Sequence, residues 1–433
     1  MADDGIDLTP FERHYGVNDP ELTEHMWEVV AHLQSACPVA HSDAPVELGG
    51  AGRGMWVVTT YDDVVAVLQD WETFSSAHRW KLEAQTPGQM GDMPPISTDL
   101  PLQREFRRLL NPYLTPQAVA THEPQVRHIV TELIDDFIEN GRCDLVGQLA
   151  FLHPPRMLYQ VLFGIEEDAE LHRTLGFLHG ISTARDAASY REAFTAWTGW
   201  ITEFVESRRA APRRDDVIDA LLHGTVEGRP LTDAEISGAI RILILGGFYT
   251  TTDATSSAMM LLLDHPDIER QVRRDPSLLP KMFDETLRLE TPVISQYRVC
   301  TRDVELHGRQ LRRGEAVVVH IGGANRDPHE FDDPAELRTD RPRNRHLAFG
   351  VGPHRCIGSN VARLNLRVVF EEILSRMHDI RIAEGETPRH SPASLGWGWE
   401  YVPLTFTPGP RLLSRPAPAA TSAGGARPDA GTR

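Results

Sequence analysis

Apolar residues recur at helical spacing over most of this chain. Positions three and four apart are apolar in six long stretches, which we predict to be helices: 62–69, 126–140, 190–209, 233–265, 280–290 and 359–377. Short apolar or alternating stretches predict strands of small sheets at 55–59, 317–320 and 402–406. Because no β-α-β series is visible, the pattern predicts a mainly helical fold of the α+β kind.

The longest predicted helix has clear start and stop signals. Thr232 and Glu235 have the spacing of a capping box, in which each side chain accepts a hydrogen bond from the other residue's backbone N–H. The apolar pattern continues to Asp264, just before His265 and Pro266. A helix of about 30 residues spans roughly 45 Å, so we expect it to cross the whole molecule.

Composition favours one large unit between two tails. The 433 residues are 41% hydrophobic, and their composition does not change sharply before the last twenty. We expect residues 1–20 to form a loose arm and residues 21–413 to form a single domain. Residues 414–433 are rich in Ala, Pro, Gly and Ser, and we expect a disordered tail there.

Charge, apolar runs and cysteines restrict the partners and the compartment. A net charge of −18 argues against nucleic acid and anionic membranes as partners. No apolar run is long enough to span a bilayer, and the N-terminus lacks a basic region followed by an apolar stretch. The four cysteines are scattered, so neither a zinc site nor a disulfide framework is indicated. We expect a cytoplasmic protein that does not bind membranes.

The segment 349–358, with the sequence FGVGPHRCIG, surrounds one cysteine with glycines and cations. Glycines permit a tight turn and a close approach to a flat ligand, while backbone N–H groups and cations stabilise a thiolate. The alternative is a structural cysteine buried in a glycine-rich turn. The pattern F-G-x-G-x-H-x-C-x-G resembles the haem-binding loop of the cytochrome P-450 superfamily. This resemblance implies a long central helix across a buried haem b, with the Cys356 thiolate as iron ligand and Phe349 against the cofactor.

The resemblance extends to candidate partners of the haem propionates. Arg107, Arg298 and His354 match the family's propionate-contacting positions, and buried propionates require such cations. Gln103 stands where many relatives carry histidine, and an amide can hydrogen-bond a propionate without adding charge. We also predict weaker cofactor contacts from His346 and from Arg341.

Glu285 and Arg288 have an E-x-x-R spacing, which places a carboxylate and a guanidinium on one helix face. The pair resembles the family's structural salt bridge near the haem loop, which implies a role in folding rather than in chemistry. Glu105 and Arg108 have the same spacing. Only the position about seventy residues before Cys356 selects Glu285 and Arg288.

The long helix contains LGGFYTT at 245–251, which resembles the family's distal motif of two small residues, one variable residue, an acid and a threonine. Gly246 and Gly247 would let the backbone bulge to admit dioxygen, at a cost of about 1 kcal/mol for each glycine in a helix. Thr250 would hydrogen-bond the distal oxygen or an ordered water. Close packing of the helix on a neighbour is the alternative reason for two glycines.

The chain departs from the family pattern at Tyr249, which occupies the acid position. A phenol with a pKa of about 10 is a poor proton shuttle at neutral pH. Asp253 does not restore the motif, because a shifted register would put Thr250 and Thr251 where small residues are needed. We therefore expect proton delivery to depend on Thr250, water and a polar group of the substrate.

The family's pocket segments, carried over to this sequence, are mostly apolar and aromatic, which fits a hydrophobic or aromatic small molecule. Ser295 or Gln296 could orient it, and the alternative for Trp397 is a core position in a strand. The predicted pocket residues are Phe248, Val293, Ile294, Ser295, Leu395 and Trp397.

Five arginines would lie around the thiolate face of the haem and could steer an acidic electron-transfer protein, although a solvated helix face is the alternative. They are Arg104, Arg108, Arg355, Arg363 and Arg367. The chain contains no flavin or iron–sulfur segment, so the resemblance implies electrons from a ferredoxin and its NAD(P)H-dependent reductase.

Together these features imply a monooxygenase that inserts one atom of O2 into its substrate. One alternative is a haem-thiolate oxidase that catalyses coupling, desaturation or peroxide-driven oxidation. A haem-binding sensor without turnover is the other.

Overall fold

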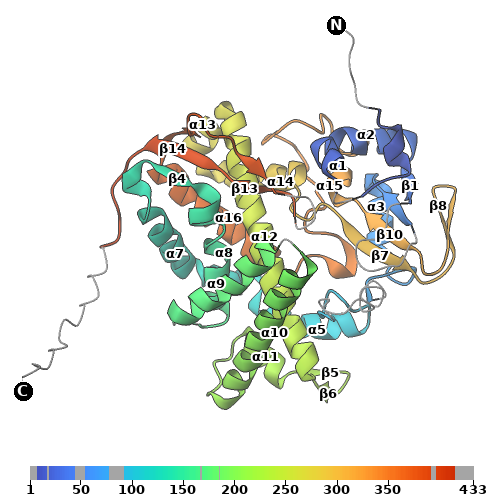
Figure 1. Ribbon diagram of the computed structural model, residues 1–433, viewed down its shortest axis with the longest axis horizontal. Helices are drawn as coiled ribbons and strands as arrows, with labels where there is room; N and C mark the ends of the chain where they lie inside the picture. Colours follow the sequence, from blue (N-terminus) through green and yellow to red (C-terminus); the bar gives the residue numbers. More distant parts are fainter. Residues whose placement is uncertain are drawn as a thin grey trace, which may run out of the picture.

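The computed structural model describes residues 7–16, 19–43, 54–77, 92–165, 168–184, 186–391 and 396–414. Figure 1 shows a sheet-rich part around β1, β7 and β10 beside a larger helical part, with the long helix α12 between them. The helices are α1 (Pro20–Glu24), α2 (Met26–Ala36), α3 (Tyr61–Gln69), α5 (Leu102–Leu110), α6 (Pro116–Ala120), α7 (Glu123–Asp135), α8 (His153–Arg156), α9 (Asp168–Thr183), α10 (Ala187–Ala210), α11 (Val217–His223), α12 (Asp233–Asp264), α13 (Pro266–Arg274), α14 (Leu279–Leu289), α15 (Ile321–Ala324) and α16 (Ser359–Arg376).

Shorter helical segments join several of these helices. Five are 3₁₀ turns: η1 (Thr9–Glu12), η2 (Asn111–Tyr113), η3 (Ile138–Asn140), η6 (Pro276–Leu278) and η7 (Gly352–His354). Two are π-helical: η4 (Val146–Ala150) and η5 (Met157–Leu162).

The largest sheet has the order β1 (Val39–Ser42), β2 (Met55–Val58), β10 (Ala316–Val319), β7 (Gln296–Cys300) and β3 (Phe74–Ser75). Strand β10 runs parallel to β2, and the other neighbours are antiparallel. The smaller sheets pair β11 (His378–Ile382), β14 (Pro403–Thr407) and β4 (Arg142–Asp144), and, as hairpins, β12 (Arg389–His390) with β13 (Trp399–Tyr401), β5 (Thr225–Val226) with β6 (Arg229–Pro230), and β8 (Val304–Leu306) with β9 (Arg309–Leu311).

Successive side chains of a strand point to opposite faces of the sheet. Both faces of the five-stranded sheet are buried, because an apolar cluster covers each of them. Val57 and its partner Val318 pack in one cluster with α2. Val58 and Val319, also paired, pack in a second cluster with α3. This explains why the central strands read as continuous apolar runs rather than as alternating ones.

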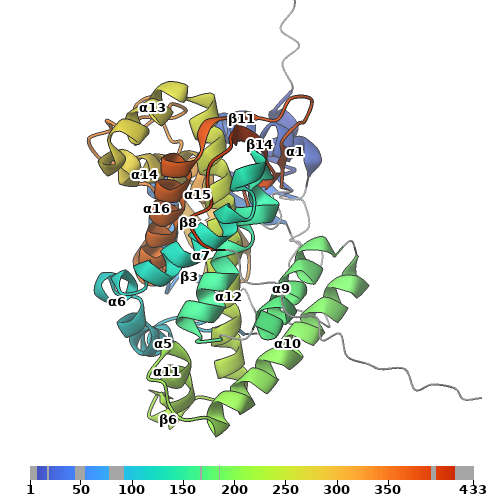
Figure 2. The same ribbon diagram turned by 90° about the vertical axis from the view of Figure 1, so that its left-hand side faces the viewer.

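Helix α12 crosses the molecule, with α9 and α10 on one side and α14 and α16 on the other (Figure 2). Its first turn has the predicted capping box: Glu235 N–H donates to Thr232 Oγ1 at 3.3 Å, and Thr232 N–H donates to Glu235 Oε2 at 2.8 Å. At 32 residues, α12 is about 48 Å long. All residues from 251 to 259, in its second half, are buried, because this part of the helix is enclosed by the protein interior.

The six predicted helices and three predicted strands are present, with ends within three residues of those expected except in one helix. The helix predicted to end at residue 140 ends at Asp135, and the separate turn η3 follows it. Several other helices, among them α2, α5 and α9, were not predicted. The loose arm is wrong for residues 7–16, since Phe11 and Tyr15 are buried against α2 and the sheet. The predicted disordered tail lies outside the described residues apart from Ser414, and the single domain over 21–413 stays a prediction. None of the described helices is both long and apolar enough to cross a membrane.

Candidate active site

A cavity of about 270 Å³ lies between α12 and the cysteine loop. One wall is the loop, with Phe349, Gly350 and Cys356, and the opposite wall is the middle of α12. The edges come from α5, from the segment after α14 and from η5. Side chains from distant parts of the sequence therefore enclose one space.

Two glycines shape the cysteine loop. Gly350 and Gly352 have φ values of 66° and 74°, a region that side chains other than glycine's disfavour. A Cβ on Gly352 would also lie only 2.9 Å from the carbonyl oxygen of Leu68 in α3. The Cys356 N–H closes the loop by donating to the Phe349 carbonyl at 2.7 Å. The loop can therefore pack on α3 while it presents the Cys356 thiol to the cavity.

The environment of Cys356 contains opposing influences on the thiol. Burial raises its pKa above the ordinary value, whereas the backbone N–H groups of Gly358 and Ser359 and the charges of Arg107 and Arg355 lower it. These N–H groups open α16, where the helix dipole also favours negative charge. A thiolate formed here by metal binding has four electropositive groups around it.

A group of basic side chains lines one edge of the cavity: Arg107 of α5, Arg298 of β7, and His354. Burial and the charges of both arginines lower the pKa of His354 to about 4, so it is neutral at neutral pH. The His354 Nε2 atom is buried and has no hydrogen-bond partner among the described residues. The arginines also hold the local structure, because Arg107 donates to the Arg355 carbonyl at 2.7 Å and Arg298 to the Tyr297 carbonyl at 2.7 Å.

Gln103 lines the cavity as predicted, but its amide nitrogen donates to the Pro353 carbonyl at 2.5 Å. It therefore ties α5 to the cysteine loop. The prediction that His346 contacts the cofactor is not supported: His346 does not line the cavity, and its Nε2 lies 3.4 Å from Asp284. The predicted contact of Arg341 with the cofactor is not supported either: Arg341 does not line the cavity, and its Nε lies 3.0 Å from Glu285 Oε1.

On the opposite wall, Gly246, Gly247 and Thr250 all line the cavity. A Cβ on Gly246 would meet open space, whereas one on Gly247 would lie 2.9 Å from the Leu158 side chain. The two glycines therefore have different structural roles. Gly246 leaves space in the cavity, and Gly247 lets α12 pack closely against Leu158. The expected bulge is absent, because α12 runs unbroken through this point and Thr250 Oγ1 donates to the Gly246 carbonyl at 2.8 Å.

Tyr249 does not reach the cavity, although the family pattern places an acid there. Its hydroxyl donates to the Leu178 carbonyl of α9 at 3.3 Å, and its ring lies 4.4 Å from that of Phe248. The phenol therefore joins α12 to α9 on a side of the helix away from the reacting space.

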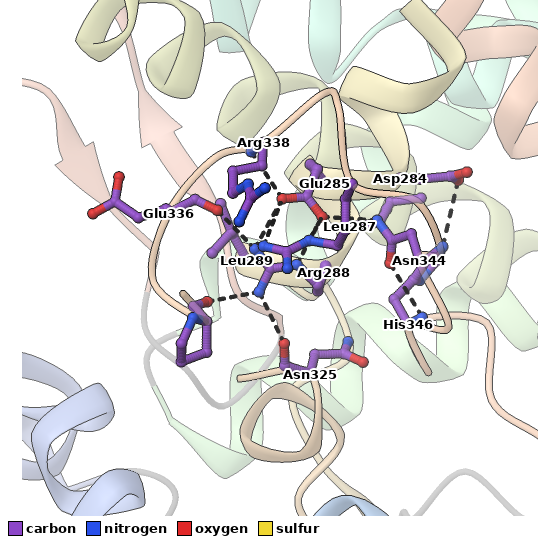
Figure 3. A network of polar contacts seen from close by, with 12 residues as sticks. Asp284, Glu285, Leu287, Arg288, Leu289, Asn325, Glu336, Arg338, Asn344 and His346 are labelled. Carbon is purple, nitrogen blue, oxygen red and sulfur yellow. Dashed lines mark hydrogen bonds and ion pairs between the residues drawn. The ribbon is translucent and has the colours of Figure 1, made fainter. Parts of the chain in front are cut away.

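Glu285 and Arg288 form a buried ion pair in α14, with Nε–Oε1 and Nη2–Oε2 distances of 2.8 and 2.9 Å. Figure 3 shows Glu285 also accepting from Asn344, while Arg288 reaches the carbonyl of Asn325. Burial alone would raise the pKa of Glu285, but Arg288, the Arg338 N–H and Arg341 hold it below its ordinary value. The network fastens α14 to the chain that leads into the cysteine loop.

Most of the predicted substrate residues do not line the cavity; among those described, Val293 does. Phe248 packs on Phe151 at 4.8 Å, and Ile294 belongs to the core beside the sheet. Ser295 lies near Tyr15. Trp397 is a core residue whose indole N–H donates to Glu290 at 2.6 Å, which is the alternative the sequence left open. Leu395 lies outside the described residues.

The sequence reasoning missed several apolar side chains that line the cavity. Ile242 and Leu243 precede Gly246 by one turn on the same face of α12, so helical periodicity could have identified them. Leu158 and Leu162 come from η5, where no local motif marks them as pocket residues. The missed lining residues include Leu158, Leu162, Ile242, Leu243 and Ile321.

The five arginines expected around the thiolate face carry less net positive charge as a group than predicted, because three of them pair with carboxylates. Arg363 pairs with Asp284 at 2.5 Å, Arg367 with Glu123 at 2.5 Å, and Arg108 with Glu105 at 3.1 Å. Arg104 and Arg355 are exposed and have no ion pair among the described residues.

These residues fit a haem on observations of the cavity itself. The Cys356 thiol lies on one wall of the cavity. Gly246 lies on the opposite wall and has open space where a side chain would be, and the walls between them are mainly apolar. Arg107, which has no carboxylate partner among the described residues, and the unpartnered nitrogen of His354 lie at one edge. A partly buried guanidinium favours an anion beside it, and a neutral imidazole can donate a hydrogen bond to that anion; the propionates of a haem supply such anions.

Comparison with known proteins identifies the family. The cytochrome P-450 family model matches residues 182–396. A steroid C26-monooxygenase of Mycolicibacterium smegmatis is 32% identical over 367 residues, which cover 84% of this chain and 90% of that protein. A cytochrome P-450 of Saccharopolyspora erythraea is 29% identical over 362 residues, 81% of this chain and 87% of the relative.

Solved structures agree with these relatives. A cytochrome P-450 from Bacillus megaterium, in complex with corticosterone, has a TM-score of 0.77 and 26% identity, and the match covers 89% of this chain and 99% of that one. A post-tailoring hydroxylase of himastatin biosynthesis has the same TM-score at 29% identity, and the match covers 89% of this chain and 97% of that one. Proteins of this family bind haem b through a cysteine thiolate. The chain therefore belongs to the cytochrome P-450 family of haem-thiolate monooxygenases and is of the bacterial type.

Proposed function

We propose that this monooxygenase inserts one atom of O2 into a hydrophobic small molecule, using electrons from an external ferredoxin and its NAD(P)H-dependent reductase. The observation that carries the proposal is the placement of Cys356 across one mainly apolar cavity from Gly246 and Thr250. Haem held by a cysteine thiolate supplies the oxidising chemistry, because the thiolate pushes electron density that favours O–O cleavage.

The residues around the cavity have separate proposed roles. Cys356 binds the iron, and Phe349 packs against the cofactor. Arg107, Arg298 and His354 hold the propionates by charge and hydrogen bonds. Thr250, whose hydroxyl borders the cavity, holds a proton near the reacting oxygen.

The substrate is proposed from the chemistry of the distal walls. Ile242, Leu243 and Val293 are apolar, and Gln296 is a polar side chain that could orient a ligand's oxygen. Relatives named for steroid oxidation and a structural neighbour crystallised with corticosterone place steroids first among ligands to test.

The experiment for this function has two parts. Cys356→Ser should remove the absorbance at about 450 nm that carbon monoxide gives with thiolate-ligated ferrous haem. Addition of a binding steroid or other apolar ligand to the wild-type protein should shift the haem from low to high spin. An unchanged carbon monoxide spectrum in Cys356→Ser would show that another group binds the iron.

The placement of Tyr249 favours a second candidate, a haem-thiolate oxidase whose reaction is coupling or desaturation. Its hydroxyl bonds to α9 and does not border the cavity, so the usual acid is missing from position 249. Product analysis with ¹⁸O2 separates the two, because only oxygen insertion leaves the label in the organic product.

The proposal includes a redox-partner surface and a compartment. Exposed Arg104 and Arg355 supply a local positive surface for an acidic ferredoxin. A cytoplasmic location is supported by the four cysteines, none of which forms a disulfide.

A further inference from the structure

Asp253 is a buried carboxyl in the middle of α12 with no evident structural partner. Its exposed fraction is 8%, and burial is the one influence found on its pKa, with no contribution from a cation or a hydrogen-bond donor among the described residues. Unpaired carboxyls are rarely buried, because the transfer of the charged form out of water is costly. A reason other than packing is therefore required for an acid at this position.

The Asp253 carboxyl packs against the backbone of two glycines, Gly396 and Gly398. A Cβ on Gly396 would overlap its Oδ2 atom, and a Cβ on Gly398 would come within 2.7 Å of its Oδ1 atom. The Pro292 carbonyl is 3.5 Å from the same point on Gly396, and Pro292 lines the cavity. The two glycines thus leave space for the acid directly behind the cavity wall.

Asp253 also adjoins the distal residues of α12. Ala254 and Thr250 line the cavity, and side chains three residues apart on a helix are neighbours, with Cβ atoms about 5–6 Å apart. The Thr250 hydroxyl can accept a proton from one side while it donates its own to the other. One turn further, Ser257 has a buried hydroxyl without a hydrogen-bond partner among the described residues, which continues this polar face of the helix.

We propose that Asp253 is the proton-supplying acid of this active site and acts through Thr250, in place of the acid that position 249 lacks. The inference rests on the proposed monooxygenase function. It also revises the expectation from the sequence: the motif keeps its register, and the acid comes from the next turn of the helix.

The protonation state of Asp253 supports this role. Burial raises its pKa to about 8, so the carboxyl carries a proton at neutral pH. No charged side chain contributes to the shift. Titratable groups on segments near this part of α12 include Glu290, which is paired with Arg326 and the Trp397 indole, and half-buried His390, whose ring packs on Trp397. Another is buried His153 of α8, which is neutral because burial lowers its pKa to about 3.

The proton balance of the reaction fits a single acid that is used repeatedly. Each turnover takes up O2, two electrons from the reductant and two protons, inserts one oxygen atom into the substrate and releases the other as water. The Asp253 O–H bond breaks to give one proton to the Thr250 oxygen, which passes its own proton on. The carboxylate is then reprotonated from solvent before it donates again.

The first test is infrared spectroscopy of the ferric holoprotein labelled with ¹³C-carboxyl aspartate. We expect the carbonyl stretch of a protonated aspartic acid at pH 7, with loss of the band at a midpoint near the pKa of about 8. Asp253→Asn should remove the band. Glu290→Gln, which alters the other buried acid of raised pKa, should keep it. Absence of the band from the wild-type protein at pH 7 overturns the proposal.

The second test is turnover with a generic ferredoxin system and a ligand that shifts the spin state. Asp253→Asn should release several-fold more peroxide per NAD(P)H consumed. We expect product formation by the wild-type protein to decline as pH rises through about 8, and Asp253→Asn should lose this decline. The same pH profile and peroxide yield in both proteins overturn the proposal. If the wild-type protein with carbon monoxide lacked the absorbance at about 450 nm, that result would instead contradict the haem-thiolate function itself.

Discussion

Tyr249 and Asp253 lie one turn apart on α12, yet their side chains have opposite surroundings. Tyr249 extends away from the cavity and donates to a backbone carbonyl of α9. Asp253 faces backbone beside the cavity wall and has no partner among the described residues. In the segment 245–253, the family pattern expects an acid at position 249. The single acid in this segment is instead Asp253, at its end.

Replacement of Tyr249 by phenylalanine tests whether the phenol serves packing between helices. The Leu178 carbonyl would lose its hydroxyl donor, so we expect the free energy of unfolding to fall by about 1 kcal/mol. Urea denaturation of the holoprotein measures the change. Tyr61→Phe is a matched control, because the Tyr61 hydroxyl also donates to a carbonyl, that of Arg345, but at an exposed site where water can replace it. Equal losses in the two variants would contradict the assignment.

At the scale of elements, α14 owes its position to Glu285 and Arg288. Arg288 donates to the carbonyls of Pro334 and Glu336, and Glu285 accepts from three groups that precede the cysteine loop, namely Arg338 N–H, Arg341 and Asn344. One helix therefore organises a stretch of chain that has little regular structure of its own.

Arg288→Ala should destabilise the protein by about 3–5 kcal/mol, because it leaves the Glu285 charge buried without its partner. Arg108→Ala is the matched control: its pair with Glu105 has the same spacing, but it is exposed and should contribute about 0–1 kcal/mol. Denaturant midpoints measure both changes. A loss in Arg288→Ala no larger than in the control would show that the network is not structural.

The same pair predicts the direction of acid sensitivity. The pKa of Glu285 is lower in the folded protein than its ordinary value of 4.5, so its stabilising effect is present above that value. The effect is lost as pH falls through the lower, folded-state pKa. The difference in denaturant midpoint between the wild-type protein and Glu285→Gln should therefore shrink as pH is lowered below 4.5.

At the scale of the whole molecule, the cavity joins segments that are far apart in the sequence. Its walls come from α5, α12, the start of β7 and the cysteine loop, whereas no residue of β1 or β2 lines it. A cofactor that binds this cavity in the folded state alone stabilises the fold by mass action, by about 4 kcal/mol at a thousand times its dissociation constant.

Removal of haem should therefore lower the melting temperature of the protein. In hydrogen exchange, we expect the largest gain of exchange in α5, the loop 349–358 and the middle of α12. The β2–β10 pair, which is buried between two apolar clusters, should change little and is the internal control. Uniform loss of protection across all elements would show that the cavity does not stabilise these segments selectively.

The amount that could be predicted differs between the fold and the site. Helical periods, the capping box at Thr232 and the glycines around Cys356 are local patterns, and each was found where the sequence places it. The basic residues at 107, 298 and 354 were also found together at the cavity. The direction of Phe248 and Ile294 was predicted wrongly, and Trp397 takes the core position that was left open as an alternative, because neighbouring residues of a segment can face a core or a cavity equally well.

The sequence alone determined the main helices, the cysteine loop, the candidate cofactor residues and the absence of an acid at position 249. These features depend on spacing within a few residues, which local backbone geometry converts directly into structure. The tertiary structure decided that Tyr249 faces α9, that His346 pairs with Asp284, and that Asp253 is buried against Gly396 and Gly398. Those outcomes depend on which distant segments pack together, since burial and charge around a side chain come from its neighbours in space.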